Sequence, residues 1–324
     1  TMELIRLSAR SVRDLLKDRQ VSPLELLDAL EHRISEVDGA VNALPTLCFE
    51  RARQRAREGD LSGLPLAGIP VAIKDLLPVS GVRTTFGSMA YRDHIPDASD
   101  LLVERIEAAG GIVYAKSNTP EFGAGANTFN DVFGFTRNPW NTALSAAGSS
   151  GGSAVALATG MAWLATGSDL GGSLRNPASF CSIVGLRPSQ GRIPSDPGEI
   201  AFNRLSMEGP MARNVNDAAM LLDVMAGYDS RDPMSLDNPT VSFEKVAAEQ
   251  RVPPRIAFSP DLGVTPVDPE VAEICERAAF RFEELGANVG KAHPDFSGLQ
   301  EVFQVHRAVS YGTSLGPELE ANRD

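Results

Sequence analysis

Residues 147–177 read AGSSGGSAVALATGMAWLATGSDLGGSLRNP, a stretch that places two serines in two glycine-rich turns. Ser149 lies in the first turn and Ser173 in the second, 24 residues later. Glycines beside a serine let the backbone adopt positive φ or approach another segment closely. Between the turns, residues 152–160 predict a helix of small residues and residues 162–166 a short buried strand. Ser173 is therefore expected where a strand gives way to a turn and a helix, a place where backbone N–H groups can hold an anion.

Length and composition are those of an ordinary globular protein. The chain has 324 residues, of which 43% are hydrophobic, enough for a large core. Its net charge of −12 argues against a nucleic-acid-binding surface, which needs a clustered basic face. The longest apolar run, residues 154–167, is too short to cross a bilayer. Cys48, Cys181 and Cys275 form no close pair, so the sequence predicts neither a disulfide framework nor a zinc site, and a reducing cytoplasm is expected.

The chain alternates between strand and helix patterns. A capping box at Ser22 begins a helix that Gly39 is expected to end. Further strands are expected at 71–73, 112–115, 183–186 and 256–259, and further helices at 49–58, 100–109, 217–226, 269–285 and 298–309. Residues 316–324 are polar and carry no strand pattern. This alternation predicts an α/β fold, a central mixed β-sheet covered by helices on both faces, in a single domain.

The chemistry of a serine nucleophile requires a base, because a hydroxyl is a weak nucleophile at neutral pH. None of the four histidines lies near either serine turn, and we expect them to be surface or structural residues. A lysine can replace histidine where burial lowers its pKa. Lys74 ends an apolar strand and has such surroundings, whereas Lys116 ends its own strand without a serine turn to serve. A relay of Ser149, Ser173 and Lys74 is thus a hypothesis, beside the alternative that Lys74 is a surface residue.

The lysine strand and the two serine turns belong to a larger pattern. It comprises GIPVAIKD at 68–75, NPW at 138–140, GSSGGS at 148–153, GSDLGGSLR at 167–175 and GLRPSQGR at 185–192. With this pattern the chain resembles the amidase signature hydrolases over residues 22–225. In that family the lysine precedes the first motif serine by an interval like the 75 residues here, and the interval of 24 agrees as well.

The resemblance implies a set of catalytic roles. Ser173 would attack the amide carbonyl, Ser149 on a cis peptide bond would relay the proton, and a neutral Lys74 would accept it. Water would then hydrolyse the acyl-enzyme at Ser173 through the reverse relay. Neither a metal nor an organic cofactor is implied.

The resemblance also implies three supporting groups of residues. An oxyanion hole would use the backbone N–H groups of Leu170, Gly171 and Gly172, with that of Ser173. The two turns would be held in register by Ser150, Asp169 and Arg175, for which plain structural bonding is an equally open interpretation. The acyl pocket would be lined by Phe122, Gly123 and Ala124, with core packing the alternative for Phe122.

The leading functional hypothesis is an amidase that cleaves the C–N bond of a small-molecule amide, with carbamates (urethanase activity) and esters as further substrate classes. Two alternatives stay open: the A subunit of a tRNA-dependent amidotransferase, and a catalytically silent binding or scaffold relative. RPSQ at 187–190 weighs against the amidotransferase, which usually has tyrosine after Lys-Pro-Thr, and the retained lysine and serines weigh against the scaffold. No nucleic-acid or membrane partner is expected, and a homodimer is left open.

The expected organisation is one amidase signature domain over residues 1–324. Residues 1–60 would form a helical N-terminal layer, residues 64–226 the catalytic core, and residues 250–324 the start of the C-terminal portion. Members of the family run well past 324 residues. The resemblance therefore implies that the rest of the C-terminal part is missing from this sequence.

Overall fold

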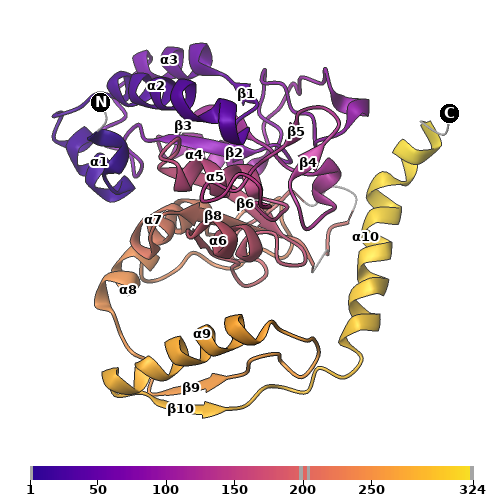
Figure 1. Cartoon of the computed structure of the whole chain (residues 1–324). Helices are drawn as coiled ribbons and strands as arrows, with labels where there is room; N and C mark the ends of the chain where they lie inside the picture. The colour runs from indigo at the N-terminus through magenta and orange to yellow at the C-terminus, as the bar shows by residue number, and fades with distance from the viewer. Residues whose placement is uncertain (1–2, 197–199, 203–204, 322–324) are drawn as a thin grey trace. The chain divides into compact units, whose positions relative to one another are not determined.

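The computed structural model describes residues 3–196, 200–202 and 205–321. The chain divides into two compact units, Thr1–Ala247 and Ala248–Ala321. The principal sheet of the first unit has six strands, and the second unit has a two-stranded sheet (Figure 1). The residues predicted for catalysis all lie in the first unit.

Three helices near the N-terminus begin the first unit. They are α1 (Ala9–Lys17), α2 (Pro23–Val41) and α3 (Phe49–Arg57). The predicted capping box is present, because Ser22 Oγ accepts from the N–H of Glu25 and the Glu25 side chain accepts from the N–H of Ser22. The prediction that Gly39 ends α2 is wrong. The helix continues for two more residues and ends at Asn42, whose φ of 54° is a left-handed conformation that asparagine tolerates.

The six-stranded sheet has the order β1-β3-β2-β6-β8-β7. Its strands are β1 (Thr46–Leu47), β2 (Pro70–Lys74), β3 (Ile112–Ser117), β6 (Leu164–Asp169), β7 (Val184–Gly185) and β8 (Met207–Ala212). β2 runs parallel to β3 and β6, and the other neighbouring pairs are antiparallel. This arrangement confirms the predicted mixed sheet. Every residue of β2, β3 and β6 is buried, which explains their nearly continuous apolar sequences.

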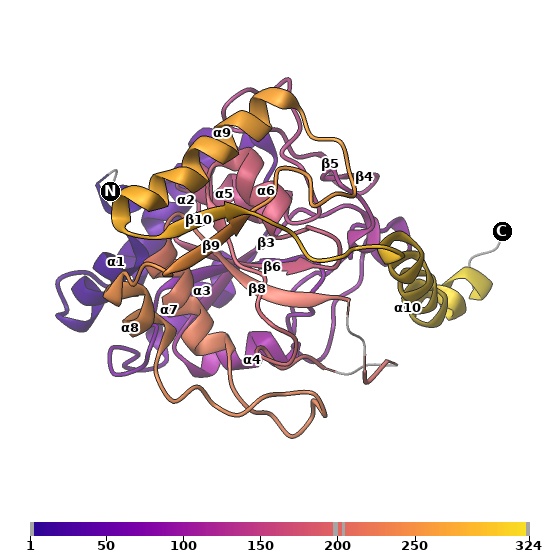
Figure 2. The same ribbon diagram turned by 90° about the horizontal axis from the view of Figure 1, so that it is seen from below.

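Helices cover both faces of this sheet, as predicted. On one face lie α5 (Gly151–Ala158) and α6 (Arg175–Cys181), and on the other α4 (Leu101–Ala108) and α7 (Val215–Met225) (Figure 2). The start of α5 approaches neighbouring backbone so closely that a Cβ on Gly152 would lie 2.3 Å from the Asn118 nitrogen. Only glycine fits there, and this contact fixes the helix that follows the first serine turn.

Two features of the sheet differ from the sequence expectations. β6 begins at Leu164 and extends to Asp169, so Ser168 and Asp169 belong to the strand rather than to the turn after it. β8 was not predicted, because Gly209 and Pro210 in its interior are unfavourable in strands. β8 nevertheless pairs with β6 along its whole length.

Smaller elements complete the first unit. A two-stranded antiparallel ribbon is formed by β4 (Phe129–Asn130) and β5 (Gly134–Phe135). A 3-10 turn spans Glu121–Gly123, and the helix α8 covers Phe243–Glu249.

The second unit is built around two parallel strands. They are β9 (Arg255–Phe258) and β10 (Asn288–Lys291), connected through α9 (Pro269–Phe280) and a 3-10 turn. The helix expected at 298–309 is α10 (Leu299–Ala321), so residues 316–321, expected to be irregular, are helical. Residues 322–324 of that expected tail lie outside the described ranges. The assignment of all 324 residues to one domain stays a prediction.

Over the described ranges, the structure has no helix both long enough and apolar enough to span a membrane.

Candidate active site

Lys74 is the centre of the site. It is the last residue of β2, and its side chain is fully buried. Its Nζ lies 2.7 Å from Ser149 Oγ, 2.9 Å from Ser150 Oγ and 2.8 Å from Ser168 Oγ. Its backbone N–H donates to Thr166 Oγ1 at 2.9 Å, which ties the end of β2 to β6. The structure thus brings together Lys74 and Ser149, which are 75 residues apart in the sequence.

Burial determines the charge state of this lysine. Removal of the ammonium from water lowers the pKa of Lys74, whereas the negative charges of Glu208 and Asp169 act in the opposite direction. The effect of burial is the largest, so the pKa lies below the ordinary range of lysine. A buried lysine of this kind can rest as a neutral amine and accept a proton from a hydroxyl group in contact with it.

The first serine turn is held in place by Thr128. Its hydroxyl donates to the carbonyl of Ala147 at 2.8 Å and accepts from the N–H of Gly151 at 3.1 Å, so it contacts the turn on both sides of Ser149. The peptide bond between Gly148 and Ser149 is cis. Ser149 itself is 2% exposed, and its hydroxyl therefore faces a largely dry environment.

The second serine turn connects β6 to α6. Ser173 lies in this turn and is partly exposed. The N–H of Ser150 donates to the carbonyl of Ser173 at 3.2 Å, so the two turns are joined through the backbone. This contact brings the residue after Ser149 directly against Ser173.

Asp169 holds the shape of the second turn. Its buried carboxylate accepts from the backbone N–H groups of Gly172 and Leu174 and from two nitrogens of Arg175, and Arg187 lies 3.2 Å from Oδ1. Burial by itself would raise the pKa of Asp169, but the hydrogen bonds from Arg175 and from the Gly172 N–H outweigh it and lower the pKa. The carboxylate therefore stays ionised and organises the turn, in agreement with the structural alternative considered for Asp169 and Arg175.

The predicted oxyanion hole is only partly available. The N–H of Gly172 donates to Asp169 at 2.7 Å and is therefore engaged within the turn. Gly172 has a φ of 122°, which suits glycine alone. Leu170 and Gly171 remain the predicted donors, and their role stays a prediction.

The predicted acyl-pocket segment lies beside Ser149. A Cβ on Gly123 would lie 3.5 Å from Ser149 Oγ and 2.7 Å from Leu76 Cδ1. Phe122 is half-buried, and its ring meets that of Tyr91 edge-on with centroids 6.1 Å apart. Gly123 and Phe122 are thus next to the predicted relay, and Ala124, which follows them, is exposed.

Sequence reasoning missed two side chains of this site. Ser168 contacts Lys74, and its position within the GSDLGGS motif on a strand, five residues before Ser173, was the available signal. Glu208 faces Ser168 from β8 as its antiparallel partner. No pattern pointed to Glu208, because its strand was itself not predicted.

Lys116 also differs from its sequence interpretation. Far from ending a strand without a partner, it is completely buried and donates to Asp75 Oδ1 at 2.9 Å, to the Leu77 carbonyl at 2.9 Å and to Thr84 Oγ1 at 2.8 Å. Asp75 follows Lys74 directly, and its other oxygen accepts from Thr85. This buried ion pair anchors the chain immediately after the candidate base.

Replacing Lys116 with methionine is expected to lower the free energy of unfolding by about 3–5 kcal/mol, because the carboxylate of Asp75 would remain buried without its counter-charge. Urea denaturation followed by circular dichroism measures the change. Arg92→Met is the matched control, since it breaks an exposed ion pair with Asp93 and should cost less than about 1 kcal/mol. Equal effects of the two substitutions would contradict the structural role assigned to Lys116.

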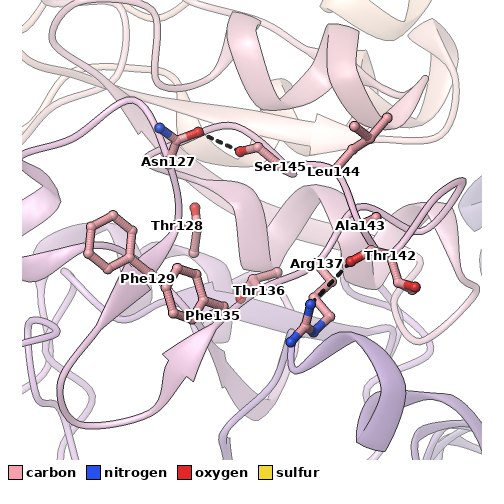
Figure 3. Close-up of a pocket in the computed structure, with 10 residues that line it drawn as sticks. All are labelled: Asn127, Thr128, Phe129, Phe135, Thr136, Arg137, Thr142, Ala143, Leu144 and Ser145. Carbon is pink, nitrogen blue, oxygen red and sulfur yellow. Dashed lines mark hydrogen bonds between the residues drawn. The ribbon is translucent and has the colours of Figure 1, made fainter.

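A cavity of about 420 Å³ lies behind the first serine turn (Figure 3). The rings of Phe129 and Phe135 stack at one side of it, and the Asn127 amide oxygen meets the Ser145 hydroxyl at the other. None of the three predicted catalytic residues lines it. The described part of the chain offers no cluster of three or more His, Cys, Asp or Glu side chains that could hold a metal ion.

Comparison with known proteins gives consistent results. An acylamidase of Rhodococcus erythropolis is 38% identical over 302 residues, which cover 91% of this chain and 63% of that protein. The A subunit of the glutamyl-tRNA(Gln) amidotransferase of Moorella thermoacetica is 40% identical over 293 residues, which cover 88% of this chain and 60% of that protein. The chain thus spans about three fifths of the length of these curated relatives.

Solved structures and the family comparison agree with these relatives. A bacterial aryl acylamidase of the amidase signature enzymes superimposes with a TM-score of 0.90 at 30% identity, covering 98% of this chain and 68% of that one. A 6-aminohexanoate cyclic dimer hydrolase complexed with substrate gives a TM-score of 0.88 at 31% identity, covering 98% of this chain and 67% of that one. The family model described as Amidase matches residues 25–311. With this match over most of its length, the chain belongs to the amidase signature family.

Proposed function

We propose that the protein is an amidase that cleaves the C–N bond of a small-molecule amide through an acyl-enzyme on Ser173. The observation that carries the proposal is the 2.7 Å contact between Lys74 Nζ and Ser149 Oγ in a buried environment that lowers the pKa of the lysine. A neutral amine against a hydroxyl is the arrangement that a serine relay needs when no histidine is at hand. The similarity to an acylamidase and an aryl acylamidase supports the same activity.

The proposed reaction begins with attack of Ser173 Oγ on the substrate carbonyl. Ser149 takes the proton of Ser173 as it passes its own to Lys74 Nζ, so the lysine becomes an ammonium and the new C–O bond forms. The backbone N–H groups of Leu170 and Gly171 would stabilise the negative charge on the carbonyl oxygen. The proton then returns through Ser149 to the leaving nitrogen, and the C–N bond breaks.

Deacylation repeats the same relay with water as the nucleophile. Water gives its proton through Ser149 to Lys74, attacks the acyl carbon, and Ser173 leaves with a returned proton. Because this chemistry depends only on a carbonyl with a leaving group, carbamates and esters are further candidate substrates. The walls of the acyl pocket near Phe122 and Gly123 would select among them.

A second candidate is the A subunit of a tRNA-dependent amidotransferase. The observation in its favour is the 40% identity to such a protein from Moorella thermoacetica. Arg187 weighs against it, because the amidotransferase usually carries its Lys-Pro-Thr sequence at this place. Hydrolysis of an amide by the purified protein without any partner would favour the stand-alone amidase.

A cytoplasmic location is part of this proposal. Cys48, Cys181 and Cys275 are all free thiols, which suits a reducing compartment. Burial raises the pKa of Cys48 to about 11 and that of Cys181 to about 12, so neither thiol is reactive near neutral pH.

The test of the function combines labelling with a substrate panel. A fluorophosphonate should label Ser173, as identified by peptide mass spectrometry, and a panel of chromogenic anilides, primary amides, carbamates and esters should include at least one compound that is hydrolysed. Labelling without turnover of any amide would point to the amidotransferase. Absence of both would favour the catalytically silent relative and contradict the proposal.

A further inference from the structure

Glu208 occupies a place beside the lysine that the proposed reaction does not use. In the antiparallel pairing of β6 with β8, Glu208 stands directly opposite Ser168. Cross-strand partners project from the same face of a sheet with their Cβ atoms about 4.5–5.5 Å apart. Since Ser168 Oγ contacts Lys74 Nζ at 2.8 Å, the carboxyl of Glu208 lies on the side of Ser168 where the lysine amine is held.

One oxygen of this carboxyl lacks a donor. Glu208 Oε2 is buried and, among the described residues, has no hydrogen-bond partner. An ionised oxygen is costly in such a position, because no N–H or O–H group replaces the water it loses. Burial accordingly raises the pKa of Glu208, the charge of Asp100 adds to this effect, and Lys74 opposes it.

The other charges near the pair do not compensate either group. Asp169 faces Lys74 from the end of β6, but its carboxylate is engaged by Arg175 and Arg187. Asp100, the N-cap of α4, acts on Glu208 with a like charge and thus favours the protonated carboxyl. Burial raises the pKa of Asp100 itself to about 6.

We propose that Glu208 is a positioning residue for the candidate base: its carboxyl is protonated in the resting enzyme, and this leaves Lys74 as the free amine. The inference rests on the proposed function of Lys74. One proton is shared by the two groups, and it resides on a Glu208 oxygen rather than on Lys74 Nζ. The proton that Lys74 later receives comes from Ser149, and the Glu208 O–H bond remains intact.

The proposal has a consequence at alkaline pH. When the pH rises through the pKa of Glu208, a carboxylate forms near Lys74 and makes the amine a stronger base, because the negative charge stabilises the ammonium. The pH profile of kcat should therefore have two rising steps, one for Lys74 and one at higher pH for Glu208. The second step is expected to be several-fold, about 3- to 10-fold.

The experiment compares the protein with its Glu208→Gln variant. Glutamine has the shape of a protonated glutamate and cannot ionise. We expect the infrared band of a protonated carboxylic acid at neutral pH in the wild type and its absence in Glu208→Gln. We also expect the variant to keep the first step at an unchanged pH, with kcat within about 3-fold at neutral pH, and to lack the second step.

Two controls make the result specific. Glu208→Asp keeps a titratable carboxyl and should retain a second step, which also guards against a folding defect in the glutamine variant. Asp93→Asn removes one exposed carboxylate and should change neither the band nor the profile.

Two results would overturn the proposal. Absence of the band in the wild type would mean that Glu208 is ionised at rest. A shift of the first step to lower pH in Glu208→Gln, by about one unit or more, would mean the same, because removal of a carboxylate lowers the pKa of Lys74. The infrared measurement needs no turnover, so if no substrate is hydrolysed the proposed function fails while the protonation of Glu208 is still decided.

Discussion

Replacing Ser173 with alanine is expected to lower kcat for amide hydrolysis by about 10⁵- to 10⁶-fold, because the oxygen that forms the acyl-enzyme is removed. The fold should be unaffected. Ser173 contacts the first turn through its backbone carbonyl, which accepts from the Ser150 N–H, and alanine retains that carbonyl. The free energy of unfolding should therefore change by no more than about 0.5 kcal/mol.

The measurement is the steady-state rate with the best substrate of the panel, together with fluorophosphonate labelling. Ser179→Ala is the matched control, because Ser179 is an exposed serine in α6 whose hydroxyl donates only to the Asn176 carbonyl. The control should keep the wild-type rate and its label. Labelling of the Ser173→Ala variant at another serine, with activity retained, would show that the nucleophile has been assigned to the wrong residue.

Replacing Lys74 with methionine is expected to lower kcat by about 10³- to 10⁴-fold, the usual contribution of a general base. Methionine fills the volume of the buried side chain but provides no amine for Ser149. Lys74→Arg should be equally inactive, since arginine stays protonated and cannot accept the proton. Ser149→Ala should retain more activity than either variant, because the base itself is still present.

The pH dependence of the wild type gives the same assignment independently. Only the neutral amine can accept a proton, so kcat/KM should rise with pH as Lys74 loses its proton and level off above its pKa. Burial lowers this pKa below the ordinary value near 10.4, so we expect the plateau to be reached by about pH 9. Lys17→Met, which removes an exposed lysine at the end of α1, should leave the profile unchanged. A rate for Lys74→Met within 10-fold of the wild type would refute the role of base.

Much of the fold was accessible from local sequence patterns. The caps at Ser22 and Asp100 predicted where α2 and α4 begin, since the side-chain oxygen of an N-cap meets only nearby N–H groups. The apolar runs predicted β2 and β3, because strands buried on both faces need nearly continuous hydrophobic sequence. The glycine-rich turns, read with the spacing of 75 and 24 residues, indicated Lys74, Ser149 and Ser173.

Other features had no local signal. β8 carries glycine and proline in its interior, and its pairing with β6 comes from partners about 40 residues away that leave no trace in the strand itself. Glu208 was missed with it. Lys116 looks like any lysine at a strand end, and its burial depends on Asp75 and Thr84 closing over it from another part of the chain.

The amino-acid sequence thus specified the elements and the reactive groups, because helix caps, hydrophobic periodicity and glycine turns act between residues close together along the chain. Which charges surround the lysine amine is a property of the packed sheet. β2, β6 and β8 are adjacent there although they are distant in sequence, and the resulting burial and cross-strand neighbours govern the pKa of Lys74.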